Sequence, residues 1–188
     1  MTPAPPAPPL TVSLLPYEHL LDERPRSQVD LVVIHCTELP DLAMAREFGE
    51  QVHYDSGTGN SGHFYVDRDG SVHQYVSVER TAHHVRGHNP RAIGIELVNT
   101  GRYPDWLAAG NQHMREPYSD AQITGLLALL HSLRLQPVPL AVDAQGLCVP
   151  AAGVLAQCCA VVVTPRAHNP TGVALGAARW KALRRLLR

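Results

Sequence analysis

The chain has 188 residues, of which 45% are apolar and 18% are charged, and its net charge is −1 when the histidines are neutral. This length suits one compact domain, and the composition is that of a folded globular protein rather than a disordered one. The balanced charge argues against a nucleic-acid or anionic-membrane partner, and no apolar run is long enough to span a bilayer.

The first 27 residues are rich in proline and lack the basic start and apolar core of a signal peptide. We expect them to form a loosely packed arm with one short turn near residues 17–21. The four cysteines match neither a disulfide framework nor a zinc ribbon in their spacing; they are Cys36, Cys148, Cys158 and Cys159. These features favour a cytoplasmic protein in a reducing environment.

Three segments after the arm carry local signals of regular structure. Residues 31–35 (LVVIH) are apolar and β-branched, which predicts a buried strand. Asp41 is a good N-cap and predicts a helix over residues 41–51. Residues 63–67 and 71–76 flank an Asp-Gly turn, which predicts a β-hairpin.

Two further segments complete the pattern. Residues 92–98 (AIGIELV) predict a second buried strand, and Ser119 caps a long helix predicted over residues 120–134. Strands that alternate with helices indicate an α/β fold, which we expect to be a mixed sheet flanked by helices.

The residue pattern of the sequence changes at residues 136–137. The segment LAVDAQGL predicts a short strand and turn, and residues 149–159 are compatible with a helix. Residues 160–165 (AVVVTP) predict a short buried strand, and residues 176–187 an amphipathic helix.

His35 ends the first predicted strand, so its side chain leaves a rigid support at the edge of the sheet. That position suits a metal ligand, which must be held accurately. The alternative is a histidine whose ring is hydrogen-bonded to the backbone, and an isolated histidine fits that interpretation more often.

Glu96 is the single acid in the apolar run of residues 92–98. Burying an ionised carboxylate costs several kcal/mol unless it is paired. Its pKa is therefore expected to rise, which suits a general base acting on a metal-bound water. A carboxylate that hydrogen-bonds a loop backbone is an equally good interpretation of the residue by itself.

Other polar residues near these strands are weaker candidates for a site. His63 begins the hairpin, His83 and His84 follow its second strand, and Asn99 follows the strand that carries Glu96. Without a known partner, each of these histidines is better explained as lining a cleft or facing solvent than as a metal ligand.

Four segments together resemble the zinc-dependent N-acetylmuramoyl-L-alanine amidases, a fold shared with the peptidoglycan recognition proteins. They occur in the family's order over about residues 28–134 and read LVVIHCTE, SGHFYVDRDGSVHQYV, ERTAHHVRGHNPRAIGIELVNTG and YSDAQITGLLALL. The resemblance implies a hydrolase of the amide between N-acetylmuramic acid and L-alanine in muropeptides, including anhydro forms. It also implies peptidoglycan fragments as partners and Zn²⁺ as cofactor.

By the same resemblance, His35 matches the first zinc ligand and Glu96 matches the acid that activates the zinc-bound water. His63, His84 and Asn99 match positions near the cleft and are expected to contact substrate. The family's other two ligands, a histidine after a glycine and an aspartate or cysteine in a segment of the type R-K-x-D-P-G-P, have no counterpart after residue 134.

The replacements that we consider for the two missing ligands are His168 and either Asp143 or Cys148, and nothing in the sequence predicts their geometry. Residues 137–188 instead resemble part of the aminotransferase-type domain of pyridoxal-phosphate enzymes, in which Asn169 matches the asparagine of an NPTG turn. The segments that would bind that cofactor are absent, so no cofactor site is expected there.

The sequence thus predicts three parts: an arm over residues 1–27, an amidase-like domain over residues 28–135, and an aminotransferase-like fragment over residues 136–188. The leading function is a zinc-dependent amidase. The alternatives are a non-catalytic muropeptide-binding module and an inactive gene-fusion product. Marginal stability is a further expectation, because the tail replaces the packing that the family's own tail would provide.

Overall fold

The computed structural model describes residues 8–111, 114, 116–138, 140–155 and 175–186. Its centre is a five-stranded mixed sheet in the order β1-β4-β3-β5-β2. The strands are β1 (Leu10–Val12), β2 (Leu31–Cys36), β3 (Phe64–Val66), β4 (Val72–Gln74) and β5 (Ala92–Leu97). β3 and β4 form the predicted antiparallel hairpin, and the other strand pairs are parallel.

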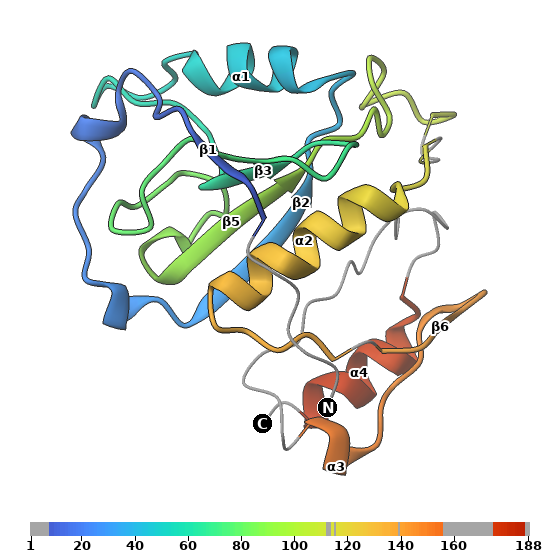
Figure 1. Cartoon of the computed structure of the whole chain (residues 1–188). Helices are drawn as coiled ribbons and strands as arrows, with labels where there is room; N and C mark the ends of the chain where they lie inside the picture. The colour runs from blue at the N-terminus through green and yellow to red at the C-terminus, as the bar shows by residue number, and fades with distance from the viewer. Residues whose placement is uncertain (1–7, 112–113, 115, 139, 156–174, 187–188) are drawn as a thin grey trace.

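Helices α1 (Leu42–Glu50) and α2 (Asp120–Ser132) lie on opposite sides of the sheet (Figure 1). Both begin where their caps predict: the Asp41 carboxylate accepts a hydrogen bond from the Met44 N–H at 2.8 Å, and the Ser119 hydroxyl accepts one from the Gln122 N–H at 3.0 Å. The fold is therefore the expected α/β arrangement, a mixed sheet flanked by helices.

Strand β3 shows how the sheet divides the core into two layers. Successive side chains of a strand point to opposite faces. Phe64 and Val66 pack with Leu126 and Leu129 of α2, whereas Tyr65 packs with the cluster that includes Ala45 of α1. The α1 face of the sheet, to which Tyr65 points, carries the candidate site.

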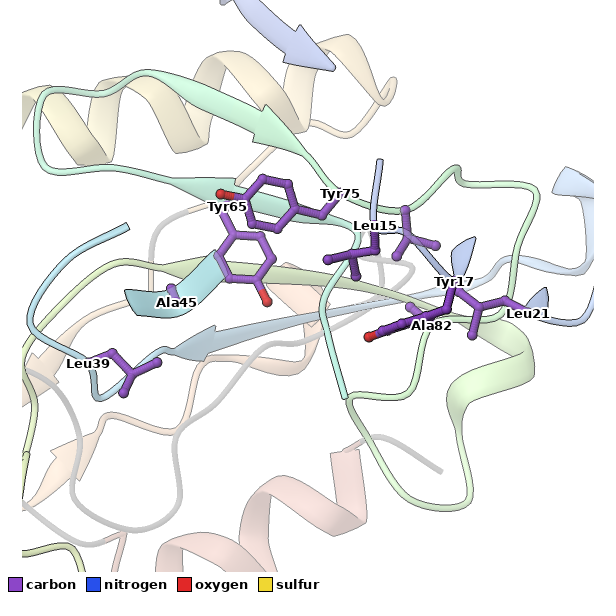
Figure 2. Close-up of a cluster of buried hydrophobic side chains, with 9 residues drawn as sticks. Leu15, Tyr17, Leu21, Leu39, Ala45, Tyr65, Tyr75 and Ala82 are labelled. Carbon is purple, nitrogen blue, oxygen red and sulfur yellow. The ribbon is translucent and has the colours of Figure 1, made fainter. Parts of the chain in front are cut away.

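From residue 8 onward, where the structure describes it, the proline-rich arm is not loosely packed, contrary to the expectation from its composition. β1 pairs in parallel with β4, and Leu15, Tyr17 and Leu21 are at most 4% exposed. Figure 2 shows these three side chains in one cluster with others from the α1 side of the sheet. The Tyr17 hydroxyl also donates to the Gly49 carbonyl at 2.5 Å. The predicted turn is the 3-10 helix η1 (Glu18–Leu20); η2 (Arg26–Gln28) follows it.

The C-terminal part carries a small separate cluster. The predicted strand and turn form the two-stranded pair β6 (Val142–Asp143) and β7 (Gly146–Leu147), followed by α3 (Ala152–Leu155) and α4 (Ala177–Leu186). Leu147 and Leu183 are buried together. The strand expected over residues 160–165 and the turn containing Asn169 lie outside the described residues, as does the end of the helix expected over residues 149–159. Within the described ranges, no helix has the length and apolarity needed to cross a bilayer.

Candidate functional site

Strand register places the two principal candidates next to each other. His35 of β2 is paired with Glu96 of β5, and Glu96 is paired with Tyr65 of β3. Paired residues on adjacent strands present their side chains on the same face of the sheet. A row of one imidazole, one carboxyl and one phenol therefore crosses the α1 face.

A cavity of about 570 Å³ opens on this face. Glu96 and Tyr65 line it from the sheet, and Phe48 lines it from α1. Tyr54 and His83 line it from loops, with ring centroids 4.9 Å apart, and the Tyr54 hydroxyl donates to the Asn60 side-chain oxygen at 2.6 Å. The cavity thus combines aromatic surface with a few polar groups, as ligand sites usually do.

The Glu96 carboxyl is the acid of this cavity. Burial raises its pKa from 4.5 to about 8. No hydrogen bond or ion pair from another described residue stabilises the charged form, and the neighbouring Ile95 and Leu97 are buried. The alternative interpretation of Glu96 was a carboxylate that hydrogen-bonds the backbone of a loop. No such hydrogen bond is found among the described residues. A carboxyl with a pKa near neutrality exchanges its proton readily at physiological pH.

His35 and His84 form a direct ring-to-ring contact beside this carboxyl. The His35 Nε2 atom lies 3.0 Å from the His84 Nδ1 atom, and the rings meet edge to face at 81°. Burial lowers the pKa of His35, and burial, together with the charge of His35, lowers the pKa of His84 to about 4. Both imidazoles are therefore neutral at pH 7.

The side chain of His63, which the resemblance placed near the cleft, is fully buried and is not among the residues that line the cavity. The Gly94 N–H donates to its Nδ1 atom at 3.0 Å, and its Nε2 atom lies 2.8 Å from the Arg24 Nη2 atom and 3.0 Å from the Arg80 carbonyl oxygen. Burial, reinforced by the charge of the Arg24 guanidinium, lowers the pKa of His63 to about 3. His63 is thus a buried, neutral group, and its expected contact with substrate stays a prediction.

Asn99 is also fully buried and does not line the cavity. Its side-chain amide donates to the Glu116 carbonyl at 3.1 Å, and its side-chain oxygen accepts from the Gly101 N–H at 2.9 Å. These bonds hold the loop that leaves β5. Of the three expected substrate contacts, only His84 reaches the cavity.

Arg24, Tyr65 and Asn89 also shape the site, and the sequence did not single them out. Arg24 is 5% exposed and donates to the carbonyls of Val78, Asn89 and Ala92. The burial of Tyr65 could have been foreseen from the alternation of the hairpin, but its neighbour Glu96 could not. Arg24 lies in the proline-rich arm and gave no local signal.

The described residues do not fit a catalytic zinc site. In the ranges that the structure describes, no three or more histidine, cysteine, aspartate or glutamate side chains are grouped to hold a metal ion. Asp143 instead pairs with Arg179 at 2.7 Å, and Cys148 is a free thiol. His168 lies outside the described residues. Because catalytic zinc sites use three protein ligands, His35 and His84 alone do not make one.

Comparison with known proteins agrees with this fold. Residues 25–153 match the sequence model of the family described as N-acetylmuramoyl-L-alanine amidase. No curated protein matches the chain. The crystal structure of a selenomethionine AmpD derivative is 21% identical, with a TM-score of 0.52 and 93% of each chain covered.

The N-acetylmuramoyl-L-alanine amidase LysC from Clostridium intestinale URNW is also similar to this chain. It is 20% identical, with a TM-score of 0.51, and the match covers 68% of this chain and 75% of LysC. At these identities the two structures establish the fold alone. The family match reaches residue 153 and therefore passes the boundary expected at residue 135.

Proposed function

Since the chain belongs to the N-acetylmuramoyl-L-alanine amidase family, we propose that its cavity binds muropeptides and that it hydrolyses the amide between N-acetylmuramic acid and L-alanine. The observation that carries this proposal is Glu96. It is a carboxyl with a pKa of about 8 and no partner among the described residues, on the wall of a cavity large enough for a sugar–peptide junction.

The role proposed for Glu96 is proton transfer. A general base acting on water must take a proton at working pH and give it up again to the leaving amine. A pKa of about 8 leaves both protonation states populated near neutrality. The row of side chains places His35 and Tyr65 on either side of this carboxyl. Of these two, Tyr65 lines the cavity with Glu96.

Binding without hydrolysis is the second candidate function. It is favoured by one observation, namely that the described residues do not supply three metal ligands. Amide hydrolysis in this family is typically zinc-dependent, and no metal-dependent step is assigned to the described residues. In this alternative the cavity remains a recognition site for muropeptides.

One set of measurements separates the two functions. Zinc is quantified by elemental analysis on the purified chain and on His35→Ala. Calorimetry then measures binding of an N-acetyl-anhydromuramoyl peptide with and without a chelator, and chromatography measures release of the peptide. Glu96→Gln is the test variant, and Glu47→Gln, an exposed carboxylate on α1, is the matched control.

Zinc that is lost in His35→Ala, together with peptide release that is lost in Glu96→Gln but not in Glu47→Gln, would support the amidase. Binding that survives the chelator, with no release, would support the recognition module. A folded chain that neither binds nor cleaves the muropeptide would overturn both.

A further inference from the structure

The C-terminal end of α1 forms a wall of the cavity but buries little surface of its own. Of the nine residues of α1, only Ala45 and Gly49 are buried, whereas α2 buries five. The partly buried Leu42 and Met44 pack against the core from the start of the helix. Phe48 lines the cavity from the last turn and is 41% exposed. Because two small residues gain little free energy from burial, other contacts must hold this end of α1.

The end of α1 needs a hydrogen-bond donor from outside the helix. The last four carbonyls of a helix have no partner within it, and a buried carbonyl without a partner costs free energy. α1 ends at Glu50, so the carbonyl of the buried Gly49 is one of these four. The Tyr17 hydroxyl donates to this carbonyl at 2.5 Å. Tyr17 therefore supplies, from the arm, a hydrogen bond that the helix cannot make for itself.

Tyr17 also lies against the loop that follows α1. A Cβ atom at Gly59 would lie 3.1 Å from the Tyr17 Oη atom and 1.9 Å from the Gln51 carbonyl oxygen, so Gly59 packs closely against both. The same loop carries Tyr54 and Asn60, which line the cavity. The Tyr17 hydroxyl is thus placed where the α1 wall and the loop wall of the cavity meet.

The Tyr17 side chain is itself firmly placed. It is 4% exposed and packs in the cluster of Figure 2. Just before it, the Leu15 N–H donates to the Tyr75 carbonyl at 2.9 Å, which ties the arm to the sheet. The Arg46 Nη2 atom of α1 donates to the Leu14 carbonyl at 3.0 Å, which ties the arm to the helix. Burial raises the pKa of Tyr17 to about 12, so its hydroxyl stays protonated and remains a donor at neutral pH.

We propose that Tyr17 is a positioning residue of the cavity: its hydroxyl fixes the end of α1 and thereby the place of the Phe48 side chain in the wall. Tyr17 is not among the residues that line the cavity, so it acts through the backbone of Gly49. The described part of the arm is thus part of the architecture of the site. The role rests on the proposed function only for the choice of ligand in the test.

Hydrogen exchange followed by NMR on the full-length chain tests the anchoring. Tyr17→Phe keeps the ring and removes only the donor. Backbone amides of residues 48–51 should then exchange about tenfold faster relative to those of β5, the factor expected for one lost hydrogen bond of ordinary net strength. Tyr75→Phe is the matched control, because Tyr75 is as buried as Tyr17 and its hydroxyl has no hydrogen bond to a described residue. It should leave these amides unchanged.

Calorimetry with an N-acetyl-anhydromuramoyl peptide tests whether the anchoring reaches the ligand. Tyr17→Phe should weaken binding about tenfold, and Tyr75→Phe should leave the affinity unchanged. In a Phe48→Ala background, which removes the side chain from the wall, Tyr17→Phe should change the affinity by less than about twofold. A merely structural contribution of Tyr17 would lower the stability without this coupling to Phe48.

Unchanged exchange at residues 48–51 in a folded Tyr17→Phe chain would overturn the proposal, and so would an equal loss of affinity with and without the Phe48 side chain. If Tyr17→Phe does not fold, the wild-type spectrum decides: a slowly exchanging Tyr17 hydroxyl proton close to Gly49 is expected, and its absence would contradict the anchoring. Should the wild type not bind the muropeptide, the proposed function fails, and hydrogen exchange still decides the role of Tyr17.

Discussion

At Glu96, one carboxyl group lies on a strand whose adjacent residues, Ile95 and Leu97, are buried on the opposite face. The side chain faces the cavity and has no charged partner among the described residues. Its burial is therefore not compensated, and its pKa rises to about 8. The same environment that makes the residue chemically useful also makes it costly to the fold when it ionises.

Glu96→Gln should make the chain more stable than the wild type at alkaline pH. The folded-state pKa of about 8 lies above the ordinary value of 4.5, so the folded chain binds the extra proton between these values. The wild type therefore loses stability relative to Glu96→Gln as the pH rises from about 4.5 through about 8. The difference should reach on the order of 2 kcal/mol, less than the full shift implies, because the side chain keeps some contact with solvent.

Urea unfolding of both chains at about pH 5 and about pH 9 measures this difference. Glu47→Gln, which changes an exposed carboxylate, should show no such dependence on pH. Parallel stability curves for the wild type and Glu96→Gln would show that the carboxyl is not kept out of water.

At the scale of the elements, the part of the arm that the structure describes, from residue 8 onward, is the clearest case in which the composition gave a wrong prediction. Its prolines indicated loose packing, but the short segment LTVSLL pairs with β4 and places Leu15 in the core. The partner strand lies some sixty residues further along the chain. A three-residue strand carries too weak a local signal to reveal such pairing.

Leu15→Ala should lower the free energy of unfolding by about 3 kcal/mol, because a buried leucine replaced by alanine loses its packing and leaves a cavity. Leu10→Ala, at a position 46% exposed in β1, is the matched control and should cost much less. Chemical denaturation compares the two. Equal and small losses would mean that the arm does pack loosely in solution.

At the scale of the whole molecule, the described residues of the C-terminal part form a cluster apart from the main core. Among them two residues of that cluster are buried, Leu147 and Leu183, against eight described residues in the cluster that joins the sheet to α2. Elements with few buried contacts open at lower free energy than the core. We therefore expect the described part of the tail, and not the sheet, to be the part of marginal stability.

Hydrogen exchange followed by mass spectrometry should show this gradient. Backbone amides of α4 are expected to exchange well before those of β5, which is bonded to strands on both sides. Equal protection of α4 and β5 would show instead that the tail and the sheet unfold as one cooperative unit. Whether residues 136–188 descend from an aminotransferase-type domain stays a prediction.

The local sequence determined most of the elements. Caps at Asp41 and Ser119, the Asp-Gly turn and two apolar β-branched runs are short-range signals, and each of them predicted an element that the structure contains. The same runs singled out His35 and Glu96, because a polar residue in a buried strand is costly and therefore conspicuous.

Only the tertiary structure decided which of these residues meet. Register between β2 and β5 brings His35 beside Glu96, and it depends on contacts between residues about sixty positions apart. Burial separated His84, which lines the cavity, from His63 and Asn99, which are fully buried and do not line it. His84 and His63 therefore differ in their surroundings although they are the same residue type, because the role of a histidine follows from the partners of each ring nitrogen and from its access to water.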